Sequence, residues 1–239
     1  MEMLAELFTS YWHYLLIAAL AAYLISSVNT SIIVTRIVKH EDIRNLGSGN
    51  AGFTNVLRCV GKVPAIITFV GDFMKGVVST LIPYIMTVNM SSETTSQEIR
   101  TIILYTGGLF AVLGHMFPVY YKFKGGKGVV TTASVMLMTD WRVLVAELLI
   151  FGIFFVVTKT ISKCSLLCAG SYPFVAAALR LLDSMGHLSF LSPLNSPTPM
   201  FIACVFVITF INGLTIIIMH KDNIRRILDG TEKKITSKK

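Results

Sequence analysis

Long apolar stretches fill most of this 239-residue chain, and few charges interrupt them. Hydrophobic residues make up 54% and charged residues only 14%, whereas soluble domains contain about 45–50% and about 25%. A helix needs about 20 apolar residues to cross a bilayer core about 30 Å thick. The chain is therefore predicted to be an all-α, polytopic membrane protein, not a soluble, disordered or fibrous one. Its apolar stretches are 12–38, 63–88, 100–119, 128–139, 143–158, 165–182 and 200–219.

The fourth stretch, 128–139, is too short to cross an ordinary bilayer. At 1.5 Å per residue it forms a helix only about 18 Å long. It is a short or re-entrant helix, or it crosses where the protein thins the bilayer. We therefore expect about seven transmembrane helices, one of them short, or five if 128–139 and 143–158 form a re-entrant pair.

The basic residues predict an orientation. With the N-terminus outside and seven crossings, 17 of the 21 Lys and Arg residues lie inside, Lys75 lies within a span, and only Arg100, Arg142 and Arg180 lie outside. This bias is typical of cytoplasmic loops, and an even number of crossings would remove it. The net charge of +8 therefore indicates anionic lipid or phosphorylated substrates as neighbours, and not nucleic acid. The inside residues are Arg36, Lys39, Arg44, Arg58, Lys62, Lys122, Lys124, Lys127, Lys159, Lys163, Lys221, Arg225, Arg226, Lys233, Lys234, Lys238 and Lys239.

The first informative segment is 46–62, LGSGNAGFTNVLRCVGK. Gly47, Gly49 and Gly52 match the G-x-G-x-x-G fingerprint, but that motif needs a preceding strand, and Asp72, at the ribose position, lies in an apolar helix. The remaining pattern suits an anion, because glycines let backbone N–H groups approach it and Arg58 offers a guanidinium fork. An ordinary Gly/Asn turn is the alternative. The neutral donors of this segment are Ser48, Asn50, Thr54 and Asn55.

The second segment is 115–129, HMFPVYYKFKGGKGV. It is not a Walker loop, because no Ser or Thr follows Lys127. Its lysines and glycines lie at the start of the short helix, where exposed amides and the helix dipole favour a phosphate. His115 is interpreted as a structural histidine and not as a base. The predicted phosphate-binding residues are Lys124, Gly125, Gly126, Lys127 and Gly128.

The third segment is 220–232, HKDNIRRILDGTE. His220 and Asn223 share one helical face at a spacing of three. Taken alone, the segment is better explained as a basic juxtamembrane helix that binds anionic lipid. Within the spans, Asp72 and Lys75 are predicted to neutralise each other, and both a functional role and a helix-packing role stay open. Glu147 is expected near the interface.

No pattern in the chain indicates a metal or a coenzyme. The four cysteines form no CxxC pair and no Cys/His metal spacing, so we expect them to be small packing residues.

Taken together, GSGNAGFTNVLR (47–58), HMFPVYYKFKGGKGV (115–129) and HKDNIRRILDGTE (220–232) resemble the bacterial acyl-phosphate:glycerol-3-phosphate acyltransferases, which are integral membrane enzymes of phospholipid synthesis. The resemblance covers essentially the whole chain, so residues 1–239 are expected to form a single membrane-embedded domain. It implies a seven-helix fold with the N-terminus outside and the C-terminus cytoplasmic. It also implies a multi-pass protein of the bacterial cytoplasmic (inner) membrane, active as a monomer, with its site facing the cytoplasm.

The resemblance implies transfer of a fatty acyl group from acyl phosphate to the 1-hydroxyl of glycerol 3-phosphate. The products are 1-acyl-glycerol 3-phosphate (lysophosphatidic acid) and phosphate, and neither metal nor cofactor takes part. The family's essential Ser and Arg correspond to Ser48 and Arg58, with Gly47 and Gly49 beside them. Its essential His and Asn correspond to His220 and Asn223, and its structural Glu corresponds to Glu232. The second segment corresponds to the family's glycerol 3-phosphate site.

The chain departs from the family at two places. Residues 26–29 read Ser-Ser-Val-Asn instead of a Gly-Ser-Ile-Pro type sequence, and Phe53 replaces a small residue. The proton acceptor is open between His220 and the substrate phosphate, and substrate assistance is favoured. Two other functions remain. A membrane transporter of a phosphorylated solute would place polar groups near the midplane of repeated halves, and a lipid-binding scaffold would use only the basic face.

Overall fold

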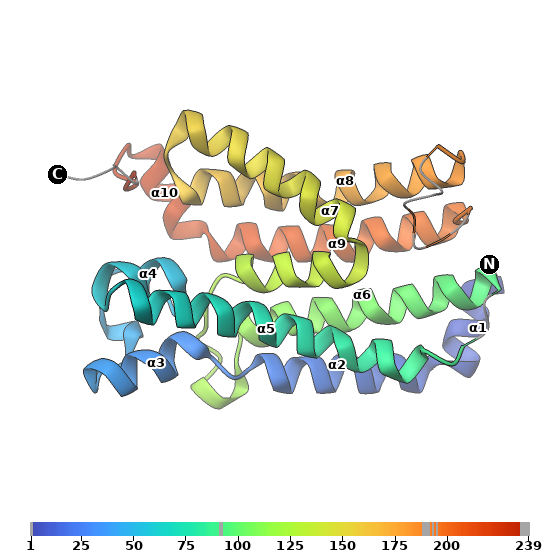
Figure 1. Ribbon diagram of the computed structural model, residues 1–239, viewed down its shortest axis with the longest axis horizontal. Helices are drawn as coiled ribbons and strands as arrows, with labels where there is room; N and C mark the ends of the chain where they lie inside the picture. The colour runs from blue at the N-terminus through green and yellow to red at the C-terminus, as the bar shows by residue number, and fades with distance from the viewer. Residues whose placement is uncertain (1, 91–92, 188–191, 193, 195, 235–239) are drawn as a thin grey trace. The chain divides into compact units, whose positions relative to one another are not determined.

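The computed structural model describes residues 2–90, 93–187, 192, 194 and 196–234. Within these ranges every regular element is helical (Figure 1), and six helices are long and apolar enough to cross a membrane. The predicted all-α, multi-pass architecture is confirmed, while the basic residues Lys238 and Lys239 lie outside the described ranges. The six candidate spans are Trp12–Lys39, Lys62–Thr87, Thr95–Tyr121, Val129–Thr158, Ile161–Ser184 and Pro199–Met219.

One helix accounts for the difference between seven apolar stretches and six spans. Helix α7 (Val129–Thr158) contains both the fourth stretch, 128–139, except for Gly128, and the fifth stretch, 143–158. At Asp140 the backbone leaves the helical region, with φ −161° and ψ 98°. The short fourth stretch is therefore the first part of α7, and the break at Asp140 separates it from the second part.

The chain divides into two compact units, and the prediction of a single domain stays a prediction. Unit 1 consists of residues 1–91 and 99–139, and unit 2 of residues 92–98 and 140–239. Unit 1 holds α1 (Glu2–Ser10), α2 (Trp12–Ser26), α3 (Thr30–Lys39), η1 (Ile43–Asn45), α4 (Phe53–Cys59), α5 (Lys62–Thr87), most of α6 (Thr94–Met116), η2 (Val119–Tyr121) and the start of α7. Unit 2 holds the rest of α7 with α8 (Ile161–Ser184), α9 (Pro199–Met219) and α10 (Lys221–Leu228).

The first span is broken between α2 and α3 without a proline. Asn29 is the N-cap of α3, where its Oδ1 accepts hydrogen bonds from the Ile32 amide at 3.1 Å and the Ser31 hydroxyl at 2.6 Å. An Asn side chain at this position satisfies amides that have no partner within the helix. The proline found at this point in the family that the sequence resembles is therefore not needed for the break.

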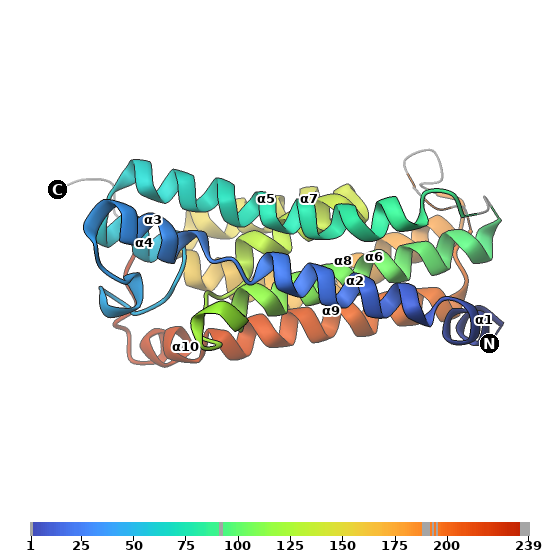
Figure 2. The same cartoon turned by 90° about the horizontal axis from the view of Figure 1, so that it is seen from below.

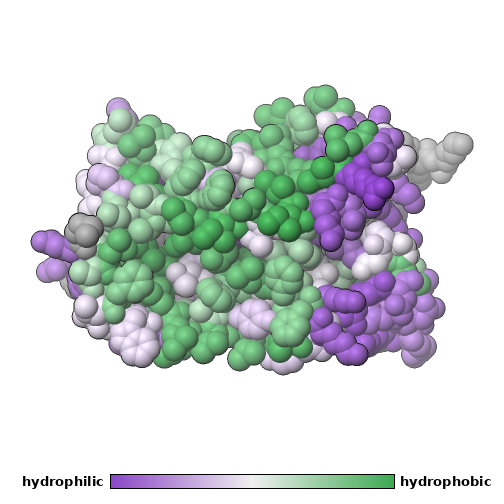
Figure 3. All heavy atoms as spheres, turned by 180° about the vertical axis from the view of Figure 1, so that it is seen from behind, coloured by the Kyte–Doolittle hydropathy of each residue, from purple (hydrophilic) through white to green (hydrophobic). Residues whose placement is uncertain are grey.

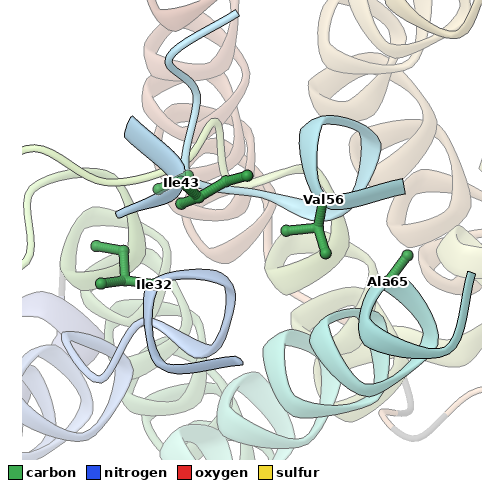
Figure 4. Packing of buried hydrophobic residues seen from close by; sticks show 5 residues of the cluster. Ile32, Ile43, Val56 and Ala65 are labelled. Atoms are coloured by element: carbon green, nitrogen blue, oxygen red, sulfur yellow. The ribbon is translucent and has the colours of Figure 1, made fainter. Parts of the chain in front are cut away.

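A small apolar cluster in unit 1 fixes the start of the first loop. Ile32 of α3, Ile43 of η1, Val56 of α4 and Ala65 of α5 are fully buried, and their side chains point toward one another (Figure 4). Figure 2 shows α3 and α4 beside the first part of α5, in agreement with the contacts between these helices. Each buried Ile or Val contributes about 1.5–3 kcal/mol, so the cluster holds both ends of residues 46–52.

In unit 2 the second part of α7 presents an apolar face, and α8 packs on α9. Leu149, Ile153 and Val157 follow one another at four-residue spacing and are 62%, 71% and 78% exposed. Hydrophobic side chains cover much of the face seen in Figure 3. Exposed apolar residues in such numbers are expected where lipid, and not water, is the solvent.

The same unit buries four charged side chains that form ion pairs. Arg142 contacts Asp140 and Asp183, each at 2.7 Å, and Arg180 contacts Asp140 at 3.1 Å and Asp183 at 3.5 Å. The sequence count assigns both arginines to the outer side of the membrane, which stays a prediction, and the structure buries their side chains within α7 and α8. Glu147, expected near the interface, is also buried, and the Ser171 hydroxyl contacts both of its carboxylate oxygens at 3.0 Å.

Candidate active site

The first loop, residues 46–52, depends on two glycines with left-handed backbones. Gly47 has φ +56° and Gly49 has φ +71°, a region that glycine enters without steric cost. A Cβ atom on Gly47 would lie 2.5 Å from both Asn55 Oδ1 and Cys59 Sγ. The loop therefore packs closely on α4, and any larger residue at Gly47 would displace it.

Asn55 holds this loop from inside. It is 2% exposed, and its Oδ1 accepts a hydrogen bond from the Ser48 amide at 3.0 Å. Its Nδ2 donates to three carbonyl oxygens between 2.9 and 3.2 Å, those of Ile43, Leu46 and Asn50. The sequence pattern indicated that Asn55 donates to an anion. An amide group has only two N–H hydrogens, and both have carbonyl partners here, so we expect Asn55 to shape the loop instead.

The other candidates of the first segment are open to a ligand. Ser48 is exposed on the loop, and Arg58 is exposed in the last turn of α4. Asn50 and Thr54 are half-buried beside them. A dinucleotide-binding site of the G-x-G-x-x-G type is excluded, because Asp72 lies within α5 and the described residues contain no strand.

The second loop folds back on the end of α6. The amides of Gly125 and Gly126 donate to the carbonyls of Met116 and His115, each at 3.1 Å. These two N–H groups therefore have partners, unlike the free amides that the sequence pattern predicts. The first amides of α7 lack helical partners and remain as candidate phosphate donors beside Gly128, whose φ is +81°. Lys124 is exposed and Lys127 is half-buried.

The two loops meet at Gly126. A Cβ atom there would collide with His115 Nε2 and would lie 2.6 Å from the Ala51 carbonyl oxygen of the first loop. On Gly125 it would collide with the His115 carbonyl oxygen. Both glycines therefore allow close approach of backbone to backbone.

The resemblance implies that the second loop binds glycerol 3-phosphate, and on that expectation we predict that Gly126→Ala raises the KM for this substrate. The added methyl group forces the second loop away from Ala51 and moves the neighbouring Lys127. Gly170→Ala is the matched control, because nothing lies within 4 Å of a Cβ atom at that position in α8. Steady-state kinetics of purified protein measures the effect, and an unchanged KM for Gly126→Ala would contradict it.

Arg44 also joins the two loops, although no motif in the sequence points to it. Its Nη1 donates to the carbonyls of Tyr121 at 2.8 Å and Lys124 at 3.3 Å. Asp42 holds the same guanidinium through Nε at 3.0 Å and Nη2 at 2.8 Å. The two carbonyls flank Lys122 and Phe123, which have φ of +57° and +58°. Such backbones persist only where the surroundings impose them.

The Asp42–Arg44 pair stays charged at physiological pH. Hydrogen bonding from Arg44 lowers the pKa of Asp42 from 3.8 to about 2, although burial opposes the shift. A carboxyl group with a lowered pKa stabilises the fold fully above its unfolded pKa, and this contribution is lost as pH falls through the folded value. The pair therefore contributes fully above about pH 4 and is lost progressively between pH 3.8 and about 2.

Arg44→Gln is expected to lower kcat/KM about tenfold, as loss of a charged hydrogen bond worth about 1.5 kcal/mol predicts. Arg36→Gln is the matched control. Arg36 also bonds Asp42, at 3.1 Å, and no bond from it to the second loop is seen among the described residues. Kinetics of the two variants separates the roles, and equal activity of both would refute the connection that we assign to Arg44.

The third segment lies in unit 2, at the junction of α9 and α10. His220 is buried, and its Nδ1 lies 2.8 Å from the Ile216 carbonyl oxygen. Because a carbonyl oxygen only accepts, the proton of the neutral ring is on Nδ1, and Nε2 carries the lone pair. His220 can therefore orient or accept a hydroxyl proton through Nε2.

Glu232 connects the chain after α10 to the start of α8. Its Oε1 accepts from Ser162 Oγ at 2.6 Å and from Asn223 Nδ2 at 2.8 Å, and its Oε2 accepts from Arg226 Nε at 2.6 Å. Burial raises the pKa of Glu232, but these three hydrogen bonds outweigh it and lower the pKa overall. Asn223 is buried and also donates to Ser162 at 2.8 Å. Ser162, which the sequence analysis missed, thus helps to fix Asn223.

No group of three or more His, Cys, Asp or Glu side chains is placed to hold a metal in the part of the chain that the structure describes. The four cysteines are free thiols.

Comparisons with known proteins agree on one family. The family model described as glycerol-3-phosphate acyltransferase matches residues 16–230. Proteins of that name from Francisella philomiragia subsp. philomiragia and Francisella tularensis subsp. novicida are 35% and 34% identical over 220 residues, covering 91% of each chain. The glycerol 3-phosphate form of PlsY, an integral membrane glycerol 3-phosphate acyltransferase, superposes with a TM-score of 0.72 at 30% identity, over 93% of this chain and 96% of that one. Its lysophosphatidic acid form gives 0.68 at 29% identity. The chain belongs to the glycerol-3-phosphate acyltransferase family.

Proposed function

We propose that this protein transfers a fatty acyl group from acyl phosphate to the 1-hydroxyl of glycerol 3-phosphate. The products are lysophosphatidic acid and phosphate. Family membership supports the acylation of glycerol 3-phosphate, because the solved relatives are described in forms with this acceptor and with lysophosphatidic acid. The observation that carries the proposal is the junction of two glycine-rich, basic loops at Gly126 and Arg44. The transporter alternative has no such support.

The charges of the loops suit two phosphorylated substrates. Acyl phosphate and glycerol 3-phosphate are both anionic, so their phosphates repel each other unless cations lie nearby. Arg58, Lys124 and Lys127 supply positive charge, and Arg58 can bind phosphate oxygens bidentately. We assign Ser48 and Arg58 to the acyl phosphate and the second loop to glycerol 3-phosphate.

The reaction needs no covalent enzyme intermediate. The 1-hydroxyl oxygen forms a bond to the acyl carbonyl carbon, and the bond from that carbon to the phosphate oxygen breaks. The electron pair leaves with phosphate, and the hydroxyl proton passes to a phosphate oxygen. In this scheme His220 Nε2 accepts a hydrogen bond from the 2-hydroxyl of glycerol 3-phosphate and so orients the acceptor. Asn223, whose Nδ2 hydrogens are bonded to Ser162 and Glu232, fixes the start of α10 beside His220.

We further propose that the N-terminus is outside, the C-terminus is cytoplasmic and the site faces the cytoplasm of a bacterial inner membrane. The excess of basic residues in the predicted inside loops supports this orientation. In a variant without the native cysteines, a cysteine at Lys233 should react with an impermeant reagent only after the inner face is exposed. A cysteine at Glu93 should react from outside. Reaction of both from the same side would contradict the orientation.

Exchange of the donor tests the proposed chemistry. Purified protein should use acyl phosphate and should not use acyl-coenzyme A or acyl carrier protein. Mass spectrometry after mixing with acyl phosphate alone should show an unmodified chain. An acylated Ser48, or comparable turnover with acyl-coenzyme A, would replace direct transfer with a covalent or thioester-dependent reaction.

A further inference from the structure

Three buried ionisable side chains of unit 1 have no part in the chemistry above. Asp72 and Lys75 of α5 are 1% and 8% exposed, and His115 of α6 is 4% exposed. Lys75 Nζ lies 3.1 Å from Asp72 Oδ1, which confirms the predicted pairing. Ionisable groups are costly inside a membrane protein and are kept there where they serve a purpose.

Lys75 connects this pair to the break between α2 and α3. Its Nζ donates to the Val28 carbonyl oxygen at 3.1 Å. Val28 lies just after the end of α2, where carbonyls lack helical partners and a cation is favourable. Because α3 leads through η1 to the first loop, Lys75 helps to fix the start of the helix that precedes this loop.

His115 connects the same pair to the second loop. Its Nδ1 lies 3.7 Å from Asp72 Oδ1, too far for a hydrogen bond but close enough for attraction. A proton on Nδ1 is favoured there, since a lone pair would face the carboxylate, and Nε2 then faces Gly126. The backbone oxygen of His115 also accepts from the Gly126 amide at 3.1 Å.

Asp72 also contacts the beginning of α7. Its carbonyl oxygen accepts from Thr131 Oγ1 at 3.3 Å, one turn after Gly128. The α2–α3 break, the end of α6 and the start of α7 therefore converge on one turn of α5. The second loop lies between the last two of these places, and the first loop follows the α2–α3 break by way of α3 and η1.

We propose that Asp72, Lys75 and His115 are positioning residues, which set the separation of the first and second loops. The inference rests on the proposed transfer to glycerol 3-phosphate. One carboxylate, Asp72, attracts both Lys75 and His115, so a shift of either loop strains a buried ion pair. The set acts through the loops, because His115 lies behind Gly126 and is buried.

A purely structural role predicts a different outcome for the variant Asp72→Asn/Lys75→Met. Replacing a buried ion pair with neutral residues of similar volume is often neutral for stability. A pair that serves packing alone would then leave kinetics unchanged. A positioning pair would leave the melting temperature nearly unchanged but raise the KM for glycerol 3-phosphate about tenfold, equivalent to one lost charged hydrogen bond.

The experiment combines kinetics with hydrogen exchange of segment 121–128 in the purified full-length chain. In the double variant we expect a raised KM, a smaller change in kcat and faster exchange of this segment, whose Gly125 and Gly126 amides are bonded in the native loop. The single variant Lys75→Arg keeps the positive charge and should retain most of the native affinity for glycerol 3-phosphate. Glu147→Gln, at a buried carboxylate of unit 2, is the matched control and should change neither readout.

Unchanged KM and unchanged exchange in a folded double variant would overturn the proposal. If the double variant does not fold, His115→Gln leaves the ion pair in place and decides by the same two readouts. Hydrogen exchange does not depend on turnover. A wild-type chain without transfer activity would therefore refute the proposed function, while exchange would still decide whether these residues position the loop.

Discussion

Arg58→Ala and His220→Ala are each expected to lower kcat/KM roughly ten- to a hundred-fold while the protein still folds and inserts. Each variant loses one contact with a charged or reacting group, worth about 1.5–3 kcal/mol. Arg58 is exposed at the end of α4, so its loss has little effect on packing. In the Arg58 variant the KM for acyl phosphate should rise, and in the His220 variant kcat should fall.

Arg225→Ala is the control for these two variants. Arg225 is exposed in α10, two residues from Asn223. Its replacement by Ala removes one positive charge from the third segment, as Arg58→Ala does from the first. Kinetics of the three purified variants should show near-native turnover only for Arg225→Ala. Full activity of both Arg58→Ala and His220→Ala would remove the basis for the assigned site.

Arg142→Leu is expected to destabilise unit 2 by about 3–5 kcal/mol, because it leaves buried carboxylates without their partner. Arg142 donates two hydrogen bonds to Asp183, at 2.7 and 2.8 Å, and further bonds to Asp140. Arg142→Leu/Asp183→Leu keeps the charges balanced and leaves the pair between Arg180 and Asp140 in place, so it should recover much of the loss. Thermal unfolding in detergent measures both, and a single variant as stable as the native chain would contradict the expectation.

The helices could be predicted because their signal is local. Apolar stretches of about 20 residues leave few alternatives in a membrane, and five of the seven stretches each correspond to one candidate span. The pairing of Asp72 with Lys75 is local too, since a spacing of three places both on one helical face. The interruption between the stretches 128–139 and 143–158 coincides with the break at Asp140, because Asp140 and Arg142 interrupt the apolar pattern there.

The inner contacts of the site could not be predicted, because they join distant residues. Arg44 bonds carbonyls that lie 77 and 80 residues away, and a backbone carbonyl has no signature in a sequence. Asn55 carries an amide group that can donate a hydrogen bond to an anion, yet its side chain bonds the backbone of the loop next to it. The ion pair between Arg142 and Asp183 could not be predicted for the same reason, since the two residues lie 41 positions apart in the chain.

Release of phosphate from acyl phosphate by the purified protein, with and without glycerol 3-phosphate, tests the central claim most directly. The account predicts rapid release only when glycerol 3-phosphate is present, with one lysophosphatidic acid formed for each phosphate. Chelators should leave this rate unchanged. Release that does not depend on glycerol 3-phosphate, or phosphate without lysophosphatidic acid, would contradict direct acyl transfer between the two phosphorylated substrates.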